Sequence, residues 1–196
     1  MYVPERVVTN ADLEKLIDTT DEWIQQRSGI KERRYAAPHE GGAEMALAAS
    51  KEALAEAGLA ANDIDMILLT TLTPDYYFPG TSSFLQDYLG LETTPTMDIR
   101  CQCSGFLYGL QTAQALVATG AYKRILLCAT EIHSRAIDMT DRGRDTAVLF
   151  GDGAAAVIIE ASDDPKRGII GCELHARGKF RDALNMQYPS IREKHL

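Results

Sequence analysis

The sequence predicts an α/β fold in which helices cover both faces of a mixed sheet. Segments rich in helix-forming residues alternate with short apolar segments over residues 42–130. Such alternation is typical of parallel strands joined by helical crossovers. Two extended runs joined by a tight connection follow after residue 146, and they predict an antiparallel hairpin that makes the sheet mixed.

The first predicted helix covers 42–57, where Ala, Leu and Glu dominate, and Gly58 stands at the position of a C-terminal cap. The apolar run 65–71 is bounded by polar residues and Pro74, which favours a strand buried on both faces. A strong helix followed by a buried strand implies a crossover connection.

The alternation continues with a helix over 81–88, a strand over 96–100, a helix over 104–119 and a strand over 124–130. The runs 146–150 and 154–160 then flank Gly151-Asp152-Gly153, which is typical of a tight turn between antiparallel strands. After Gly178 the sequence becomes polar and aperiodic.

Composition excludes several classes of protein. With 196 residues, of which 45% are hydrophobic, the chain can bury one substantial core. A net charge of −8 disfavours nucleic acid as a partner. The basic cluster Lys31, Arg33 and Arg34 is expected to be a solvated turn. The apolar runs are too short for a bilayer and no signal peptide is recognisable, so we expect a cytoplasmic protein with no membrane partner.

The four cysteines predict free thiols. Cys101, Cys103, Cys128 and Cys172 have neither the spacing of a disulfide framework nor that of zinc knuckles. We therefore expect no metal site and a reducing compartment.

Cys103 is the candidate nucleophile. It lies where the strand ending near Arg100 meets the helix beginning near Ser104, and helix N-terminal N–H groups favour a thiolate there. Gly105 would let a substrate approach the backbone, and the amide of Cys103 could help to hold an oxyanion. On spacing alone, however, a small buried side chain at a strand end is the more common role for a cysteine.

The segment Gln102-Cys103-Ser104-Gly105-Phe106, followed by Leu107-Tyr108-Gly109-Leu110, resembles the active-site segment of the β-ketoacyl-acyl carrier protein synthase III family. Other similar pieces occur in the same order over residues 4 to about 175: Pro4-Glu5-Arg6-Val7-Val8-Thr9-Asn10, Asp21-Glu22-Trp23-Ile24, Arg27-Ser28-Gly29-Ile30, Phe78-Pro79, Thr140-Asp141-Arg142-Gly143 and Phe150-Gly151-Asp152-Gly153-Ala154.

The resemblance implies a thiolase-like fold with a five-stranded type of mixed sheet, of which this chain is the N-terminal half. Residues 1–178 would form the domain that carries the nucleophile, and 179–196 would begin a linker or cap region toward a missing C-terminal half. The implied reaction transfers an acyl group from acyl-coenzyme A to Cys103. Decarboxylative Claisen condensation with malonyl-acyl carrier protein then initiates fatty acid biosynthesis. Coenzyme A thioester is a substrate here, no separate cofactor is implied, and the enzyme is expected to be a homodimer.

A coenzyme-recognition face is expected on the helix that begins near Thr19 or Thr20. Thr19, Trp23 and Arg27 are spaced by four and share one helix face. By themselves, Trp23 and Arg27 are more often a surface cation–π pair. The resemblance implies that they stack on the adenine of coenzyme A.

Further binding residues follow from the resemblance alone. Arg142, beside Gly143, would complete the nucleotide clamp, although on their own Arg142 and Arg144 look like solvated loop charges. Phe78 would close the acyl pocket across a dimer interface, whereas an aromatic before proline is otherwise usually a packing residue.

The chain also departs from the family pattern. The family's catalytic His and Asn motifs are not found, because His39, His133, His175 and His195 lie in unrelated segments; His133 is expected to be structural. The family strand that precedes Pro4 is expected at the centre of the sheet, so its absence would leave two apolar strand edges unpaired. Arg144-Asp145 looks like an insertion, and Arg100-Cys101-Gln102 replaces the usual small residues before the nucleophile.

Two alternatives remain open. The chain could be a non-catalytic half that binds coenzyme A or supports dimerisation, since it lacks the His and Asn needed for condensation. Within the enzyme class, it could serve secondary metabolism or fatty-acid scavenging instead of initiating fatty acid synthesis.

Overall fold

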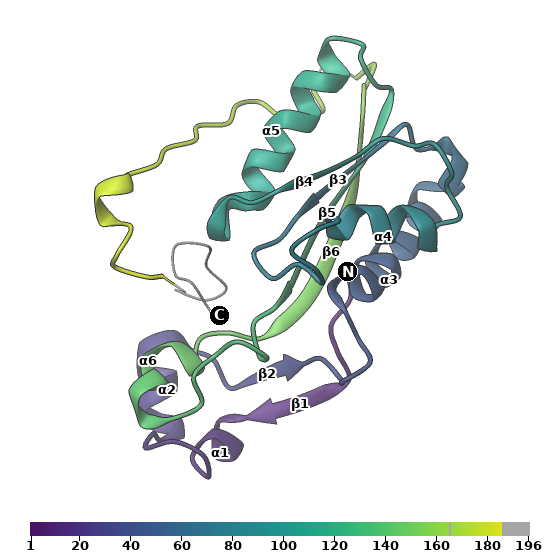
Figure 1. The fold of residues 1–196 in the computed structure, drawn as a ribbon. Coiled ribbons are helices and arrows are strands. Elements are labelled where there is room, and N and C mark those ends of the chain that lie inside the picture. Colours follow the sequence, from purple (N-terminus) through teal and green to yellow (C-terminus); the bar gives the residue numbers. More distant parts are fainter. Residues whose placement is uncertain (165, 186–196) are drawn as a thin grey trace, which may run out of the picture.

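The main sheet is mixed, as the alternation of segments predicts. The computed structural model describes residues 1–164 and 166–185. Strands β3 (Met66–Thr70), β4 (Thr96–Ile99), β5 (Arg124–Ile132) and β6 (Asp152–Glu160) are ordered β4-β3-β5-β6. Strand β3 runs parallel to β4 and β5, and β6 pairs antiparallel with β5 (Figure 1).

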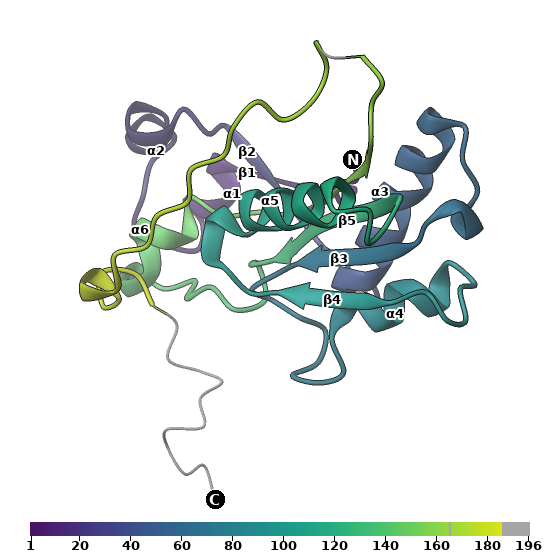
Figure 2. The same cartoon turned by 90° about the horizontal axis from the view of Figure 1, so that it is seen from above.

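Helices cover both faces of this sheet (Figures 1 and 2). Helices α3 (Gly42–Ala57) and α4 (Thr81–Tyr88) pack on one face, and α5 (Gly105–Ala118) packs on the other. Leu126 and Cys128 of β5 belong to the core beneath α3 and α4, whereas Ile125 and Leu127 belong to the core beneath α5. Alternate residues of one strand therefore stabilise opposite layers.

Local sequence accounts for these elements. Helix α3 ends at Gly58, whose φ of 66° is left-handed and suits the predicted glycine cap. All five residues of β3 are buried, which confirms a strand covered on both faces. The predicted bounds of α3 and α4 match, and those of β3, β4, α5 and β5 agree within two residues at each end.

The predicted hairpin after residue 146 is wrong. Residues 144–147 form the short helix α6 (Arg144–Ala147), and β6 pairs with β5 from Ile132↔Asp152 to Arg124↔Glu160. The Asp152 carboxylate is buried and accepts hydrogen bonds from the Ala36 N–H at 2.7 Å and the Ser134 N–H at 2.9 Å. Gly151-Asp152-Gly153 therefore begins a strand that is fixed to two other segments, instead of turning between two strands.

A smaller lobe is built from the N-terminal residues and α6. Strands β1 (Arg6–Thr9) and β2 (Glu32–Tyr35) pair antiparallel beside α1 (Asn10–Leu13) and α2 (Asp21–Ser28). The Arg33 guanidinium donates to Asn10 Oδ1 at 2.8 Å and to the Val148 carbonyl at 3.2 Å, and burial lowers its pKa. For Arg33 the expected solvated turn is wrong, because this side chain ties the lobe to the segment after α6.

The sheet has no gap at its centre, so the expectation of a missing central strand is also wrong. All neighbouring strands among β4, β3, β5 and β6 are hydrogen-bonded. Tyr2 instead pairs with Ala154 at the outer side of β6, through N–H to carbonyl bonds of 2.8 and 2.9 Å. A preceding family strand would fit at this edge, not in the middle.

Short 3-10 helices connect the remaining elements: η1 (Ala61–Asp63), η2 (Gln102–Ser104), η3 (Asp141–Gly143) and η4 (Gly178–Phe180). The boundary at 178 stays a prediction. Residues 186–196 of the predicted linker, His195 among them, lie outside the described residues. Over 1–164 and 166–185, no helix is long and apolar enough to cross a bilayer.

Candidate active site

Cys103 lies in a tight turn between the main sheet and α5. Strand β4 ends at Ile99, Cys103 belongs to the 3-10 turn η2, and α5 begins at Gly105. The preceding residue, Gln102, has a φ of 40°, and this left-handed geometry costs a non-glycine residue about 1–3 kcal/mol. The side chain of Cys103 is exposed, so it does not fill the core.

The N-terminus of α5 is held against the end of β3 by two small residues. A Cβ added to Gly105 would lie 3.4 Å from Thr70 Cβ, and one added to Gly109 would lie 2.6 Å from Leu127 Cδ1. The Thr71 N–H also donates to the Ile99 carbonyl at 3.3 Å. The carboxyl ends of β3 and β4 therefore converge with the start of α5.

The start of α5 can accept a negative charge. Among the described residues no side chain caps its first N–H groups. Uncapped N–H groups at a helix N-terminus stabilise anions such as a thiolate or the oxyanion of a tetrahedral intermediate. The arrangement thus combines an accessible thiol with hydrogen-bond donors suited to acyl transfer.

The other cysteines differ in environment. Cys128 is fully buried in β5, where burial raises the pKa of its thiol to about 12 and Ser50 Oγ lies 3.2 Å from its sulfur. Cys101 and Cys172 are partly exposed. Over the described residues, no group of three or more His, Cys, Asp or Glu side chains is placed to hold a metal ion.

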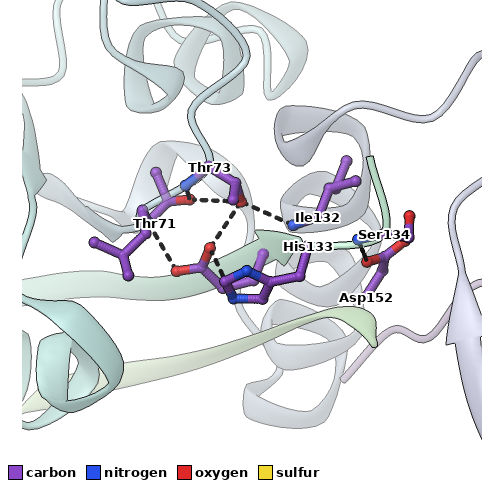
Figure 3. Close-up of polar contacts among 8 residues, drawn as sticks. Thr71, Thr73, Ile132, His133, Ser134 and Asp152 are labelled. Atoms are coloured by element: carbon purple, nitrogen blue, oxygen red, sulfur yellow. Dashed lines mark hydrogen bonds and ion pairs between the residues drawn. The ribbon is translucent and has the colours of Figure 1, made fainter. Parts of the chain in front are cut away.

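A polar network fixes the loop that follows β3 (Figure 3). The Glu131 carboxylate accepts hydrogen bonds from the Leu72 N–H at 2.8 Å and from Thr73 Oγ1 at 2.7 Å. Its Oε2 lies 3.7 Å from His133 Nε2, and the His133 ring packs against Phe150 at 4.7 Å between centroids. These contacts agree with the structural role expected for His133.

Phe78 projects from the same loop with most of its ring exposed. The Asp75 carboxylate accepts hydrogen bonds from the Gly42 N–H at 2.7 Å and the Ala43 N–H at 3.0 Å, which ties the loop to the start of α3. Phe78 itself is 81% exposed and precedes Pro79 through a cis peptide bond. Its ring meets the Tyr77 ring edge-on, at 6.5 Å between centroids, and is otherwise open to solvent, so its role in the acyl pocket stays a prediction.

Trp23 and Arg27 come together on α2, as their spacing predicts. The Arg27 Cζ lies 4.2 Å from the centroid of the Trp23 ring, and the backbone N–H of Trp23 donates to the N-cap hydroxyl of Thr20 at 3.1 Å. Thr19 precedes the helix and is not on that face. Its hydroxyl is buried without a hydrogen-bond partner in the described part of the chain.

The structure brings Arg144, which sequence reasoning did not select, to the same indole. Its Cζ lies 4.7 Å from the Trp23 centroid. Arg142 instead pairs with Asp138 at 2.7 Å while its side chain is 88% exposed. A pair of arginines separated by one residue was visible in the sequence, but only the bend between them decides which one reaches the ring.

The bend depends on Asp138 and Gly143. The Asp138 carboxylate accepts hydrogen bonds from Thr140 Oγ1 at 2.7 Å and Arg142 Nε at 2.8 Å, and these contacts lower the pKa of that carboxyl. A Cβ on Gly143 would lie 2.0 Å from the Asp138 carbonyl oxygen. Only glycine fits there, so the predicted importance of Gly143 has a backbone cause.

Comparisons with known proteins agree with this geometry. Residues 97–178 match the family model described as 3-oxoacyl-[acyl-carrier-protein (ACP)] synthase III. The β-ketoacyl-[acyl-carrier-protein] synthase III of Roseiflexus castenholzii is 47% identical over 94% of this chain and 55% of its own length. The crystal structure of 3-oxoacyl-[acyl-carrier-protein] synthase III from Aquifex aeolicus, 47% identical, superposes with a TM-score of 0.80 over 83% of this chain and 52% of that one.

A third similar protein is the priming β-ketosynthase of the R1128 polyketide biosynthetic pathway. It is 37% identical and superposes with a TM-score of 0.79 over 84% of this chain and 48% of its own. The chain spans about half the length of the relatives that it matches.

Proposed function

Because the chain belongs to the β-ketoacyl-[acyl-carrier-protein] synthase III family, with its thiolase-like fold, we propose that it carries the acyl-accepting nucleophile of a condensing enzyme. The observation that carries the proposal is the exposed thiol of Cys103 at the uncapped N-terminus of α5. The thiolate attacks the thioester carbonyl of an acyl-coenzyme A. The bond between the acyl carbon and the coenzyme A sulfur breaks, and coenzyme A leaves as a thiolate that takes up the proton lost when Cys103 ionised.

In this proposal the nucleotide of coenzyme A binds at Trp23. The indole offers a flat face, and an adenine would stack there in place of one of the guanidiniums of Arg27 and Arg144. Arg142, exposed except for its contact with Asp138, remains available for a phosphate. Thr19, with its unpaired hydroxyl, stands just before the same helix.

The second half-reaction would use malonyl-acyl carrier protein. Decarboxylation of the malonyl group supplies the carbon nucleophile that attacks the acyl group on Cys103, and coenzyme A thioester serves as substrate with no further cofactor. A homodimer is supported by Phe78, whose exposed ring on a fixed loop could close the acyl pocket of a second copy. Free thiols support a cytoplasmic location.

A role in secondary metabolism is the second candidate. It is favoured by the similarity to the priming β-ketosynthase of a polyketide pathway. The two candidates differ in acyl preference, so acylation rates across acyl-coenzyme A chain lengths separate them.

The experiment is acylation followed by mass spectrometry. Incubation with acetyl- or longer acyl-coenzyme A should place an acyl group on the peptide that contains Cys103. We expect Cys103→Ala to lose the adduct and Cys128→Ser, as the matched thiol control, to keep it. An unmodified Cys103 in protein that binds coenzyme A would contradict the proposal and favour a non-catalytic binding half.

A further inference from the structure

A second thiol stands beside Cys103 in the same turn. Cys101 and Cys103 are separated only by Gln102. Residues two apart have Cα atoms no more than about 7 Å apart even in an extended chain. Gln102 has a left-handed φ of 40° and begins the 3-10 turn η2, and this geometry bends the span. Disulfides need Cα atoms about 4.4–6.8 Å apart, a range that a bent span of this length can meet.

The environment gives the two thiols different roles. Cys103 is exposed at the start of α5, beside helix N–H groups, so an oxidant can reach it. Cys101 is partly exposed and is separated from Cys103 by one residue. Cys128 is fully buried, and Cys172 lies beside α5 with its sulfur 4.0 Å from the Leu107 carbonyl oxygen.

We propose that Cys101 is the resolving thiol of Cys103, and that hydrogen peroxide converts the pair into a disulfide. The Cys103 thiolate attacks one peroxide oxygen and the O–O bond breaks, which gives a sulfenic acid and a hydroxide that takes up a proton to become water. The Cys101 thiolate then attacks the sulfenic sulfur, and hydroxide leaves and is protonated to water. Two thiols lose two electrons in total, and one peroxide is reduced to two waters.

The consequence is a reversible block of the acyl acceptor. A disulfide that closes so short a loop is strained, and strained disulfides are reduced more readily than structural ones. The bond would therefore protect Cys103 from irreversible oxidation and release it when thiols are available. The chemistry itself does not depend on acylation and can be tested without coenzyme A.

Trypsin makes the test direct. Cleavage after Arg100 and Lys123 gives a peptide, 101–123, that contains Cys101 and Cys103 and neither Cys128 nor Cys172. After peroxide treatment and alkylation of remaining thiols, we expect this peptide to be unalkylated and about 2 Da lighter, and to recover with dithiothreitol. In Cys101→Ser, Cys103 should instead gain about 32 Da as a sulfinic acid that dithiothreitol does not remove.

Cys172→Ser is the matched control and should behave like the unchanged chain. A peptide 101–123 linked to the peptide that carries Cys172, a disulfide between two chains, or equal formation of sulfinic acid with and without Cys101 would each overturn the proposal. Cys101→Ala serves as a second variant if the serine disturbs the turn. Because no acyl donor is used, a negative result leaves the acylation proposal intact.

Discussion

Cys103 and Cys128 are the same residue type in two different regions of the fold, one at the edge of the main sheet and one in its core. Cys128 lies in β5 and faces the layer formed by helices α3 and α4. It is fully buried, and its sulfur contacts the hydroxyl of Ser50. Cys103 is exposed at the carboxyl edge of the sheet, beside helix N–H groups that no side chain of the described residues caps. The difference shows that the position in the fold, and not the residue type, decides which thiol a reagent can reach.

The two ends of the first turn of α5 also differ in how closely they are packed. Gly105 at the edge would place a Cβ at ordinary contact distance from Thr70, whereas one turn further Gly109 would clash with Leu127 in the core. The helix is thus packed tightly at Gly109 and leaves room at its start. We expect changes at the edge to alter reactivity and changes one turn inward to alter stability.

The largest expected effect is on alkylation of the two thiols. Burial raises the pKa of the Cys128 thiol to about 12, so at pH 8 only about one in 10,000 of these thiols is ionised, and burial also keeps the reagent away from it. At pH 8, iodoacetamide should label Cys103 at least about 1000-fold faster than Cys128 in the folded chain. Peptide mapping over time measures this, with labelling in urea as the control. Similar rates in the folded chain would remove the distinction between the two regions.

The next effect concerns stability on the core side. Leu127 is fully buried against α5, so Leu127→Ala should lower the free energy of unfolding by about 2–5 kcal/mol. Leu107, on the same helix but 48% exposed, is the matched control, and its change to Ala should cost about 0.5 kcal/mol or less. Urea titrations measure both. Equal losses would mean that α5 packs differently from the described arrangement.

At the edge, Arg144 and Arg142 provide a matched pair that sharpens the nucleotide assignment. Arg144 contacts the Trp23 ring and Arg142 does not. Arg144→Ala should weaken coenzyme A binding by about tenfold, the equivalent of one contact worth about 1.4 kcal/mol. Arg142→Ala should weaken binding less, but it should reduce the salt sensitivity of binding more than Arg144→Ala does, because Arg142 is the arginine available for a phosphate. Isothermal titration calorimetry with coenzyme A measures the affinity of both variants. A larger loss of affinity in Arg142→Ala than in Arg144→Ala would assign the nucleotide clamp to Arg142.

Much of the main sheet could be predicted because its signals are local. Helix α3 is composed of strong helix formers before a left-handed glycine, and β3 is apolar throughout. The error at 146–150 has a non-local cause: Val148 is apolar because it packs in the N-terminal lobe, not because it is in a strand. Asp152 looked like a turn residue, yet its carboxylate binds Ala36, more than a hundred residues away in sequence.

The candidate site also combines local features, which the sequence predicts, with contacts between distant residues, which it does not. Cys103 and the pair Trp23 and Arg27 could be placed, since a strand-to-helix junction and a spacing of four are local patterns. The contact of Arg144 with Trp23 joins residues far apart in sequence. It depends on how Asp138 shapes the intervening loop, and no pattern of residue types reveals that bend.

The smallest effect we expect is on the pH dependence of that loop. Hydrogen bonds from Thr140 and Arg142 hold the pKa of Asp138 below its ordinary value near 3.9, which an unfolded chain would show. Its contribution to stability is therefore present above about pH 4 and is lost as pH falls through the lower folded value. Asp138→Asn should lower the urea midpoint at pH 7 and have less effect at pH 3.

The single tryptophan, Trp23, lies in the affected lobe, so its fluorescence reports the transition. Asp18→Asn is the matched control, because Asp18 is exposed in the same lobe and its carboxylate makes no hydrogen bond or ion pair within the described residues. This control should leave the urea midpoint unchanged at both pH values. If Asp138→Asn lowers the midpoint equally at pH 3 and pH 7, the carboxylate charge does not hold the loop. The position of Arg144 at the ring would then have to come from Gly143 and the packing of α6.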